Sequence, residues 1–334
     1  MATVFKWGIL GPGAIAQKFA NGIEALEHAE IAAVASRSLE RANVFADQFH
    51  ITRRYGSYLE LANDPDIDAI YVATPHTFHR EHSILCLEAG KAVLCEKPFT
   101  VNAHQAAEVI EIARWKSVFL MDAMWTRFLP IYITVREWLR TDAIGDVRLL
   151  QASCGFRRPW SSEDRKMRLD LAGGALLEVG VYPLALASLA FKAPPQSIES
   201  MCHLGTTGVD EQSAILLGYE SGQLAILSFA INTPMPHDAW ICGTKGKIHI
   251  PDFWRATRAT LLLENGTQTS VEGPLSATGY EYEAAEVIRC VRQDKLESEL
   301  MPLDETLEII KTMDRIRVQL GLVYPMDGER AAAF

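Results

Sequence analysis

Continuous apolar runs alternate with helix-like segments through the first hundred-odd residues. Within each run apolar residues are nearly continuous, which is typical of strands buried on both faces of a parallel sheet. Between the runs, apolar residues recur with helical spacing, and Gly90 and Asn102 mark a helix end and a helix start. This alternation predicts an α/β fold with a covered parallel sheet. The predicted strands are 5–10, 30–37, 69–75, 92–98 and 118–124.

After Trp125 the pattern changes to strand-like segments that follow one another, several with partial alternation of apolar and polar positions. The stretch YESGQ at 219–223 is typical of a hairpin loop. Successive strands with close turns predict a large open, mainly antiparallel sheet. Two helices are expected at 280–293 and 304–320, the second with Asp304 as its N-cap. The predicted strands are 147–156, 211–220, 222–231, 238–250 and 257–264.

These two patterns predict two domains. We expect a Rossmann dinucleotide-binding domain at residues 1–124 and an α+β domain for substrate binding and dimerisation at 125–334. The length of 334 residues and the 49% hydrophobic content suffice for two cores. Asp210 and Glu211, which precede a predicted strand, are expected on a solvated turn.

Charge and composition narrow the class of protein. A net charge of −10 argues against a nucleic-acid partner, because phosphates are bound by clustered Lys and Arg. No apolar run is expected to reach the roughly 18 residues of a membrane span, and the amino terminus lacks the features of a signal peptide. The six cysteines are scattered without C-x-x-C spacing, so we expect reduced thiols, no metal site and a cytoplasmic protein.

The turn after the first predicted strand carries the first candidate site. Gly11-Pro12-Gly13-Ala14-Ile15-Ala16 fits the pattern G-x-G-x-x-A, with a strand before it and a helix after it. Gly11 permits the tight turn, Gly13 lets a pyrophosphate approach the backbone, and the helix N-terminus attracts its charge. This context predicts that Gly11, Gly13, Ala14 and Ile15 bind a dinucleotide, although such a motif also occurs in ordinary turns.

The end of the second predicted strand indicates which dinucleotide. NAD-binding folds place Asp or Glu there to hold the ribose 2′-hydroxyl. This chain has Ser36-Arg37-Ser38 instead. Arg37 is suited to a 2′-phosphate, with Ser36 assisting, so NADP is favoured and NAD remains the alternative.

Two further strand ends place polar residues where ligands of parallel sheets bind. Thr74-Pro75-His76 follows the third strand and Glu96-Lys97-Pro98 follows the fourth, so both triplets lie at carboxyl ends. Lys97 is therefore expected near the nicotinamide, although a lysine on the rim of a sheet is more often part of a salt bridge. His76 and His79 are expected to contact ribose or nicotinamide, or to cap the next helix.

The motifs together resemble the Gfo/Idh/MocA oxidoreductase family, whose E-K-P signature corresponds to Glu96-Lys97-Pro98. The resemblance covers nearly the whole chain, and its further motifs are ATPHTFH, GKAVLCEKPFTVNA, MWTRFLP, AGGALLEVGVYPL and GTKGKI. GKAVLCEKP and WTRF are especially similar to the branch of dimeric dihydrodiol dehydrogenases, which are also described as NADP-dependent D-xylose dehydrogenases. The resemblance implies an NAD(P)-dependent dehydrogenase that acts on a sugar, polyol or cyclic diol and forms a homodimer.

The family's second signature, D-x-G-x-H, corresponds to Glu178-Val179-Gly180-Val181-Tyr182. The resemblance implies that Tyr182 is the acid/base and that Glu178 orients it, with Glu in place of the family's Asp. Since a free tyrosine has a pKa of about 10, a nearby ammonium is needed to favour the phenolate, and Lys97 would supply it. Lys97 would equally suit the substrate oxygen. The resemblance further implies that Trp125, Arg127 and Phe128 line the substrate pocket, although these residues also suit core packing.

Two other functions are compatible with the same fold. The first is a non-catalytic NAD(P)-binding regulator, which would tolerate loss of Lys97 and Tyr182, and their presence argues against it. The second is an NAD-dependent glycosidase, which would hold NAD tightly and show no net cofactor turnover.

Overall fold

The computed structural model describes residues 3–157 and 159–328. Among these residues the chain forms two compact units that are discontinuous in sequence. Unit 1 comprises the chain up to Thr100 together with 104–128 and 275–306, and unit 2 comprises 101–103, 129–274 and the chain from Leu307 onward. The chain therefore returns to unit 1 near residue 275. The predicted domain boundary after residue 124 stays a prediction, because each compact unit combines several separate stretches of the chain.

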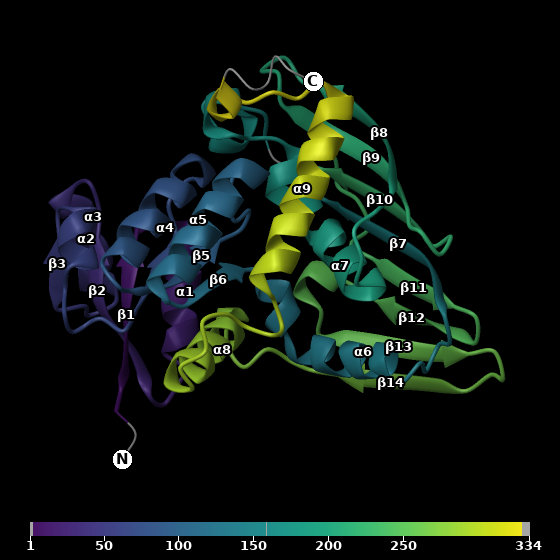
Figure 1. Ribbon diagram of the computed structural model, residues 1–334, viewed down its shortest axis with the longest axis horizontal. Coiled ribbons are helices and arrows are strands. Elements are labelled where there is room, and N and C mark those ends of the chain that lie inside the picture. The colour runs from purple at the N-terminus through teal and green to yellow at the C-terminus, as the bar shows by residue number, and fades with distance from the viewer. Residues whose placement is uncertain (1–2, 158, 329–334) are drawn as a thin grey trace. The chain divides into compact units, whose positions relative to one another are not determined.

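A parallel sheet forms the centre of unit 1 (Figure 1). Within the described residues its order is β3-β2-β1-β4-β5-β6, and every neighbouring pair is parallel. All residues of β4, β5 and β6 are buried, so both faces of this part of the sheet are covered, as the continuous apolar runs predict. The strands are β1 Phe5–Leu10, β2 Ala29–Ala35, β3 Arg53–Tyr55, β4 Ala69–Val72, β5 Ala92–Glu96 and β6 Leu120–Ala123.

Helices connect the strands of unit 1, and one helix joins it from the distant segment 275–306. The hydroxyl of Thr278, just before that helix, donates to the carbonyl of Lys18 at 2.9 Å. A Cβ at Gly22 would lie only 3.0 Å from the backbone nitrogen of Glu281, so glycine permits this close approach. The helices are α1 Ala14–Ile23, α2 Leu39–Gln48, α3 Tyr58–Ala62, α4 His79–Glu88, α5 Ala103–Lys116 and α8 Tyr280–Arg292, with 3₁₀ turns η1 His76–Phe78 and η2 Trp125–Phe128.

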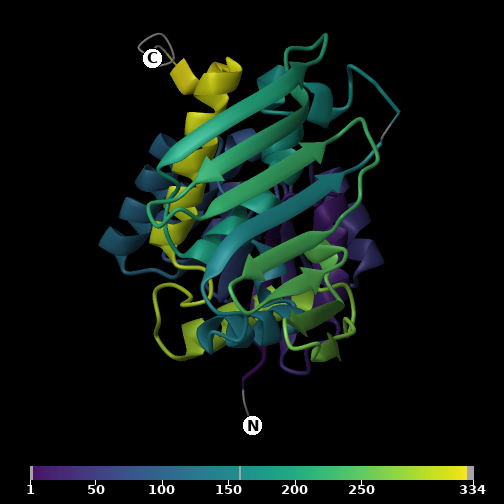
Figure 2. The same ribbon diagram turned by 90° about the vertical axis from the view of Figure 1, so that its right-hand side faces the viewer.

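A second sheet dominates unit 2 (Figure 2). Across the described residues its order is β14-β13-β12-β11-β7-β10-β9-β8, and the pairing is antiparallel except between β7 and β10. The expectation of a mainly antiparallel sheet is therefore confirmed. The strands are β7 Val147–Gly155, β8 Ser197–Leu204, β9 Asp210–Gly218, β10 Leu224–Ala230, β11 Ala239–Gly243, β12 Gly246–Ile250, β13 Arg258–Leu263 and β14 Gln268–Glu272.

Helices of unit 2 pack on one face of this sheet, and Figure 2 shows the opposite face without a helix over it. The strand β9 alternates buried and exposed residues along most of its length, as expected when only one face contacts the core. The helical elements are α6 Pro130–Arg140, the π-helical segment η5 Leu176–Gly180, α7 Val181–Phe191 and α9 Leu303–Leu320, with short turns η3 Arg165–Met167, η4 Leu169–Leu171 and η6 Phe253–Arg255.

One stretch corrects the expectation that no segment has the length and apolarity of a membrane span. Among the described residues, Leu169–Phe191 reaches a mean hydropathy of 1.6 over an 18-residue window with few charges. Within that window 83% of the residues are buried inside the protein, which is the behaviour of a core helix. Length and composition alone therefore do not assign this segment to a membrane.

Several elements escaped the sequence pattern. The strand β3 has only three residues, and most of β14 is exposed, so neither gives a strong apolar signal. The helix α7 is apolar on all sides, which removes the helical periodicity on which the prediction depends. Asp304 was expected to be the N-cap of α9, but the helix begins at Leu303, so this carboxylate lies in the first turn. The elements not predicted are β3, β8, β14, α3, α6 and α7.

Candidate active site

The Gly-rich turn leads from the end of β1 into the N-terminus of α1. Gly11 has φ of +98°, and a Cβ there would lie 3.2 Å from the carbonyl carbon of Ala73. Gly13 is the N-cap of α1, and a Cβ there would meet no atom within 4 Å, so its backbone faces open space. Ala14 and Ile15 form the first turn of α1, whose N–H groups receive no side-chain cap at Gly13. These features fit the pyrophosphate of a dinucleotide.

A cavity of about 490 Å³ lies beside this turn. It joins the turn to the ends of β2 and β4, which a parallel sheet brings to the same edge. Arg41 and Tyr58 line the cavity but were not predicted from sequence, although Arg41 follows the end of β2 closely, in the first turn of α2. The lining residues are Gly11, Pro12, Gly13, Ser36, Arg37, Ser38, Arg41, Tyr58, Ala73, Thr74 and Pro75.

Arg37 is held by aromatic neighbours at the rim of this cavity. Its guanidinium carbon lies 5.8 Å from the centroid of the Phe78 ring, within the range of a cation–π contact. Burial raises the pKa of Tyr58, while the charge of Arg37 and its hydrogen bond to Tyr58 oppose that shift. Phe78 stacks on His82 at 5.7 Å, and burial together with Arg37 lowers the pKa of His82 to about 4. His82 is therefore neutral at physiological pH, which leaves Arg37 as the cation of this group.

Glu96 and Lys97 stand at the carboxyl end of β5, as the sequence predicts. Glu96 is buried and accepts hydrogen bonds from the hydroxyl of Tyr71 and, at 3.1 Å, from the backbone N–H of Lys97. Lys97 is half-buried, and the Lys97–Pro98 peptide bond is cis. The ring nitrogens of His79 lie 2.9 Å from the carbonyl oxygen of Pro98 and 2.8 Å from that of Thr74. His79 thus ties together the ends of β4 and β5.

Two further carboxyl groups lie near Glu96 and were not foreseen. Asp122, at the end of β6, is buried, and burial and the charge of Glu96 raise its pKa to about 8, against the opposing charges of Arg127 and Lys97. Glu283 of α8 is fully buried, and burial, Glu96 and Asp122 raise its pKa well above the ordinary value. Asp122 is therefore mainly protonated at neutral pH, and the surroundings of Glu283 likewise favour its protonated form. Their proximity depends on α8 returning to unit 1, which no local motif signals.

The predicted substrate residues occupy η2 at the end of unit 1's second segment. Trp125 stacks on Tyr280 with ring centroids 4.9 Å apart, and Arg127 forms an ion pair with Glu305. Phe128 is also buried. His76 is buried as the first residue of η1. These residues have packing contacts within unit 1, and their contact with substrate stays a prediction.

In unit 2, Glu178 and Tyr182 lie on one continuous helical stretch formed by η5 and α7. Both side chains are buried. Glu178 pairs with Arg165, and its second oxygen lies 3.3 Å from the ammonium of Lys166. The longer arm of Glu thus places its carboxyl group between two basic side chains.

Tyr182 lies beside an aromatic cluster that was not predicted from sequence. Its ring centroid lies 6.2 Å from that of Trp254, which in turn packs edge-on against Phe156 at 5.3 Å. The indole N–H of Trp254 donates to the Nδ1 atom of His237 at 3.0 Å. These residues come from separate elements, so only the folded sheet brings them together. Aromatic surfaces of this kind suit the apolar face of a ring-shaped ligand.

Asp210 and Glu211 contradict the expectation of a solvated turn, because Asp210 is fully buried and Glu211 is 8% exposed. That prediction was wrong, since the two residues begin β9 in the interior of the unit. The cysteines in the described part of the chain are free, as expected, although Cys202 and Cys242 are only half-buried. The described residues contain no group of three or more His, Cys, Asp or Glu placed to hold a metal ion.

The fold and the cavity define a dinucleotide-binding protein with a separate α+β unit. Two family models match the chain: an oxidoreductase family with an NAD-binding Rossmann fold at residues 5–123, and the GFO/IDH/MocA C-terminal domain at residues 132–249. The chain belongs to the Gfo/Idh/MocA oxidoreductase family, and it is an NAD(P)-dependent oxidoreductase that acts on CH–OH groups.

Full-length relatives are similar over nearly the whole chain. The trans-1,2-dihydrobenzene-1,2-diol dehydrogenase of Xenopus laevis is 41% identical over 97% of this chain and 100% of its own length. The Mus musculus protein of the same name is 37% identical over 96% of this chain and 98% of its own. The 3-ketoreductase KijD10 of Actinomadura kijaniata, solved with NADP and TDP-benzene, is 26% identical with a TM-score of 0.82, covering 95% of this chain and 98% of its own.

Proposed function

We propose that this protein is an NADP-dependent dehydrogenase that oxidises a secondary alcohol of a sugar, polyol or cyclic diol, or reduces the corresponding carbonyl. The observation that carries the proposal is the cavity that joins the Gly11–Gly13 turn to Arg37, with Lys97 at the end of the neighbouring strand β5. The names of the relatives support the substrate class, since they are dihydrodiol dehydrogenases.

Three observations favour NADP over NAD. The strand β2 ends without an acidic residue, so the group that usually binds the ribose 2′-hydroxyl is absent from the sequence there. Arg37 and Arg41 both line the cavity and offer guanidinium groups to a 2′-phosphate. KijD10 was solved with NADP.

The chemistry divides among three side chains. Bound cofactor supplies the hydride acceptor, and the protein must remove the hydroxyl proton. Tyr182 takes this proton, Lys97 supplies the positive charge that favours the phenolate and the developing alkoxide, and Glu178 orients the helix that carries Tyr182. Trp125, Arg127 and Phe128 contribute to substrate binding, and the aromatic group of Trp254 and Phe156 packs on the ring of the substrate.

D-xylose is one substrate to test, because the branch that the sequence resembles includes D-xylose dehydrogenases. We propose a homodimer formed through the open face of the sheet in unit 2, and a cytoplasmic location with no membrane or nucleic-acid partner.

Steady-state kinetics with NADP⁺ and NAD⁺ on a panel of aldoses, inositols and diols, followed by cofactor absorbance, tests the function. Tyr182→Phe should lower turnover by about 10²–10⁴ while leaving NADP⁺ affinity nearly unchanged, because only the proton-transfer group is removed. Lys97→Met should act similarly, and the double variant should lose little more than the worse single variant.

Tyr219→Phe is the matched control, since Tyr219 has the same 7% exposure as Tyr182 but packs against Phe191. Near-normal turnover of Tyr182→Phe would show that the base lies elsewhere. Tight NADP⁺ binding without turnover of any substrate would support a regulator, and glycoside cleavage without net cofactor turnover would support a glycosidase.

A further inference from the structure

The helical stretch that carries Glu178 and Tyr182 begins against a buried carboxylate from another element. Asp210, the first residue of β9, is fully buried. Its Oδ2 atom accepts a hydrogen bond from the backbone N–H of Leu176 at 2.8 Å and another from the hydroxyl of Ser213 at 3.1 Å. Asp210 therefore caps the first turn of a helix that lies 34 residues before it in sequence.

The backbone at Gly173 and Gly174 allows the carboxylate of Asp210 to approach the start of the helix closely. Gly174 has φ of +118°, and a Cβ at that position would lie 2.2 Å from Oδ1 of Asp210. The hydroxyl of Tyr324 donates to the carbonyl of Gly173 at 2.7 Å, which fixes the backbone just before the helix. A side chain at residue 174 would displace Asp210, so the glycine and the acid form one structural arrangement.

The segment that Asp210 caps is π-helical from Leu176 to Gly180. A π-helical turn holds one more residue than an α-helical turn, and it is seldom stable without outside support. If that turn relaxed to α-helical geometry, residues on either side of it would rotate relative to each other by about 100°. Tyr182 is the second residue after the π-helical segment, so the direction of its side chain depends on the turn being kept.

The surroundings of Asp210 determine whether its buried carboxyl group is charged. Burial raises the pKa of Asp210 to about 7, and the hydrogen bonds from Leu176 and Ser213 oppose that rise. At pH 8 the group is therefore mainly an anion, and it accepts bonds at a helix N-terminus, where negative charge is favourable. An apolar residue would avoid the desolvation cost but would leave the N–H of Leu176 without an acceptor.

We propose that Asp210 is a positioning residue of the reaction, which holds the π-helical turn and so directs the hydroxyl of Tyr182. This inference rests on the proposed role of Tyr182. The cap acts through the helix, and Asp210 itself makes no contact with substrate.

The test is a double-mutant cycle at pH 8 with Asp210→Ala, Asp210→Asn and Tyr182→Phe. Asp210→Ala should lower kcat by about 10–100-fold, since small misplacement of a catalytic group has effects of this size. KM and the dissociation constant of NADP⁺ should change by less than about threefold. Asp210→Asn keeps an oxygen acceptor for Leu176 and should recover most, but not all, of the loss. In the Tyr182→Phe background, Asp210→Ala should have little further effect on kcat.

Ser213→Ala is the matched control, because it removes a donor to the same carboxylate and leaves the hydrogen bond from Leu176 in place, so it should retain kcat. The proposal is overturned if Asp210→Ala keeps kcat within twofold, or if its loss multiplies fully with that of Tyr182→Phe. If circular dichroism shows that Asp210→Ala does not fold, Asp210→Asn takes its place in the cycle, and an effect of Asp210→Asn on kcat that is the same with and without Tyr182→Phe overturns the proposal instead. If Tyr182→Phe alone retains full activity, the proposed function fails, which is a separate result.

Discussion

At the scale of single residues, the surroundings of Arg37 set the cofactor preference. The guanidinium packs over Phe78 at the cavity rim, so part of the entropy of ordering this side chain is already lost before a ligand binds. A 2′-phosphate meets a positioned fork of donors there, whereas a 2′-hydroxyl gains much less from it.

We predict that Arg37→Ala weakens NADP⁺ binding by roughly 1–3 kcal/mol and NAD⁺ binding far less, because one charge-assisted contact is lost. Titration of each cofactor into the protein, followed by calorimetry, measures both values. Arg54→Ala is a suitable control, since Arg54 belongs to the same unit and pairs with Asp47. Tighter binding of NAD⁺ than NADP⁺ by the wild type would contradict the preference.

Glu283 gives a prediction about pH. Its two carboxyl oxygens lack a hydrogen-bond partner among the described residues, and burial raises its pKa well above that in the unfolded chain. Between those two pKa values the folded state holds a proton that the unfolded state has released. The stabilising effect of this proton is complete below the unfolded pKa and is lost as pH rises towards the folded value.

Glu283→Gln removes this titration and should flatten the pH dependence of stability. We expect the free energy of unfolding of the wild type to fall with pH more steeply than that of the variant, by up to about 1.4 kcal/mol per pH unit. Urea unfolding between pH 5 and pH 8 gives both slopes. Equal slopes would mean that Glu283 ionises alike in the folded and unfolded states.

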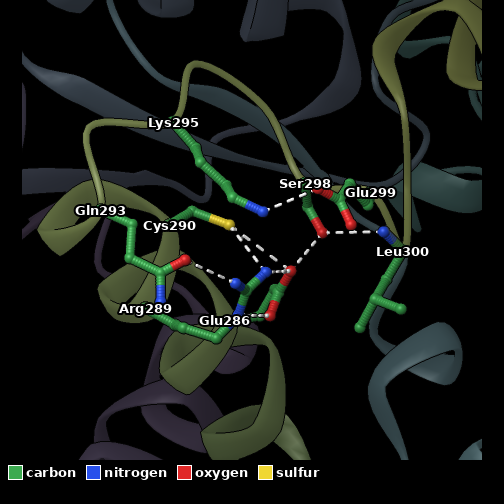
Figure 3. Close-up of polar contacts among 8 residues, drawn as sticks. All are labelled: Glu286, Arg289, Cys290, Gln293, Lys295, Ser298, Glu299 and Leu300. Atoms are coloured by element: carbon green, nitrogen blue, oxygen red, sulfur yellow. Dashed lines mark hydrogen bonds and ion pairs between the residues drawn. The ribbon is translucent and has the colours of Figure 1, made fainter.

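At the scale of elements, Glu286 joins the helix α8 to the loop before α9. Figure 3 shows its carboxylate facing Arg289 of the same helix and Ser298 of the loop. The sulfur of Cys290 lies 3.5 Å from the same carboxylate. Burial opposes ionisation, but the hydrogen bonds from Arg289 and Ser298 lower the pKa of Glu286 below its ordinary value. The carboxylate of Glu286 therefore accepts hydrogen bonds from several donors at once.

We expect Glu286→Ala to lower the free energy of unfolding by about 1–3 kcal/mol, because the buried hydroxyl of Ser298 loses its acceptor. Glu299→Ala provides the comparison in the same loop. Its carboxylate is 80% exposed and pairs with Lys295, so its removal should change stability by less than about 1 kcal/mol. Chemical denaturation of both variants measures the difference, and equal effects would refute the role of Glu286.

Local signals explain which parts of the candidate site could be predicted. The turn Gly11–Gly13 and the end of β2 at Arg37 lie beside the strands that place them, so their spacing carries the information. Asp210 and Glu283 contact residues that are far away in sequence, so no local motif reveals these contacts. Both are buried, whereas an acidic residue in a sequence normally indicates an exposed position. The side chain of Trp254 likewise reaches Tyr182 only through the folded sheet of unit 2.

At the scale of the whole molecule, the uncovered face of the second sheet bears on assembly. Leu216 and Ile226 lie opposite each other on β9 and β10, and they are 52% and 41% exposed. Met201 on β8 is 79% exposed on the same face. Adjacent exposed apolar side chains on the open face of a sheet are typical of a surface that another chain covers.

We predict a homodimer that Leu216→Asp together with Ile226→Asp dissociates, because charges would be buried without partners. Sedimentation velocity at micromolar concentration distinguishes the two states. Leu59→Asp is the control, since Leu59 is similarly exposed, at 54%, on α3 of unit 1. A wild-type monomer would contradict the dimer, and a dimer that survives both charges would contradict this interface.

The return of residues 275–306 to unit 1 has a consequence during synthesis. A ribosome releases the chain from its amino terminus, so the strands β1 to β6 emerge long before α8. Until α8 arrives, the surface of α1 around Gly22 and the rings of η2 remain without their cover. The first unit thus remains incomplete while about 150 residues of the second unit are synthesised. We expect chaperones to bind the part of the first unit that precedes α8 during this interval.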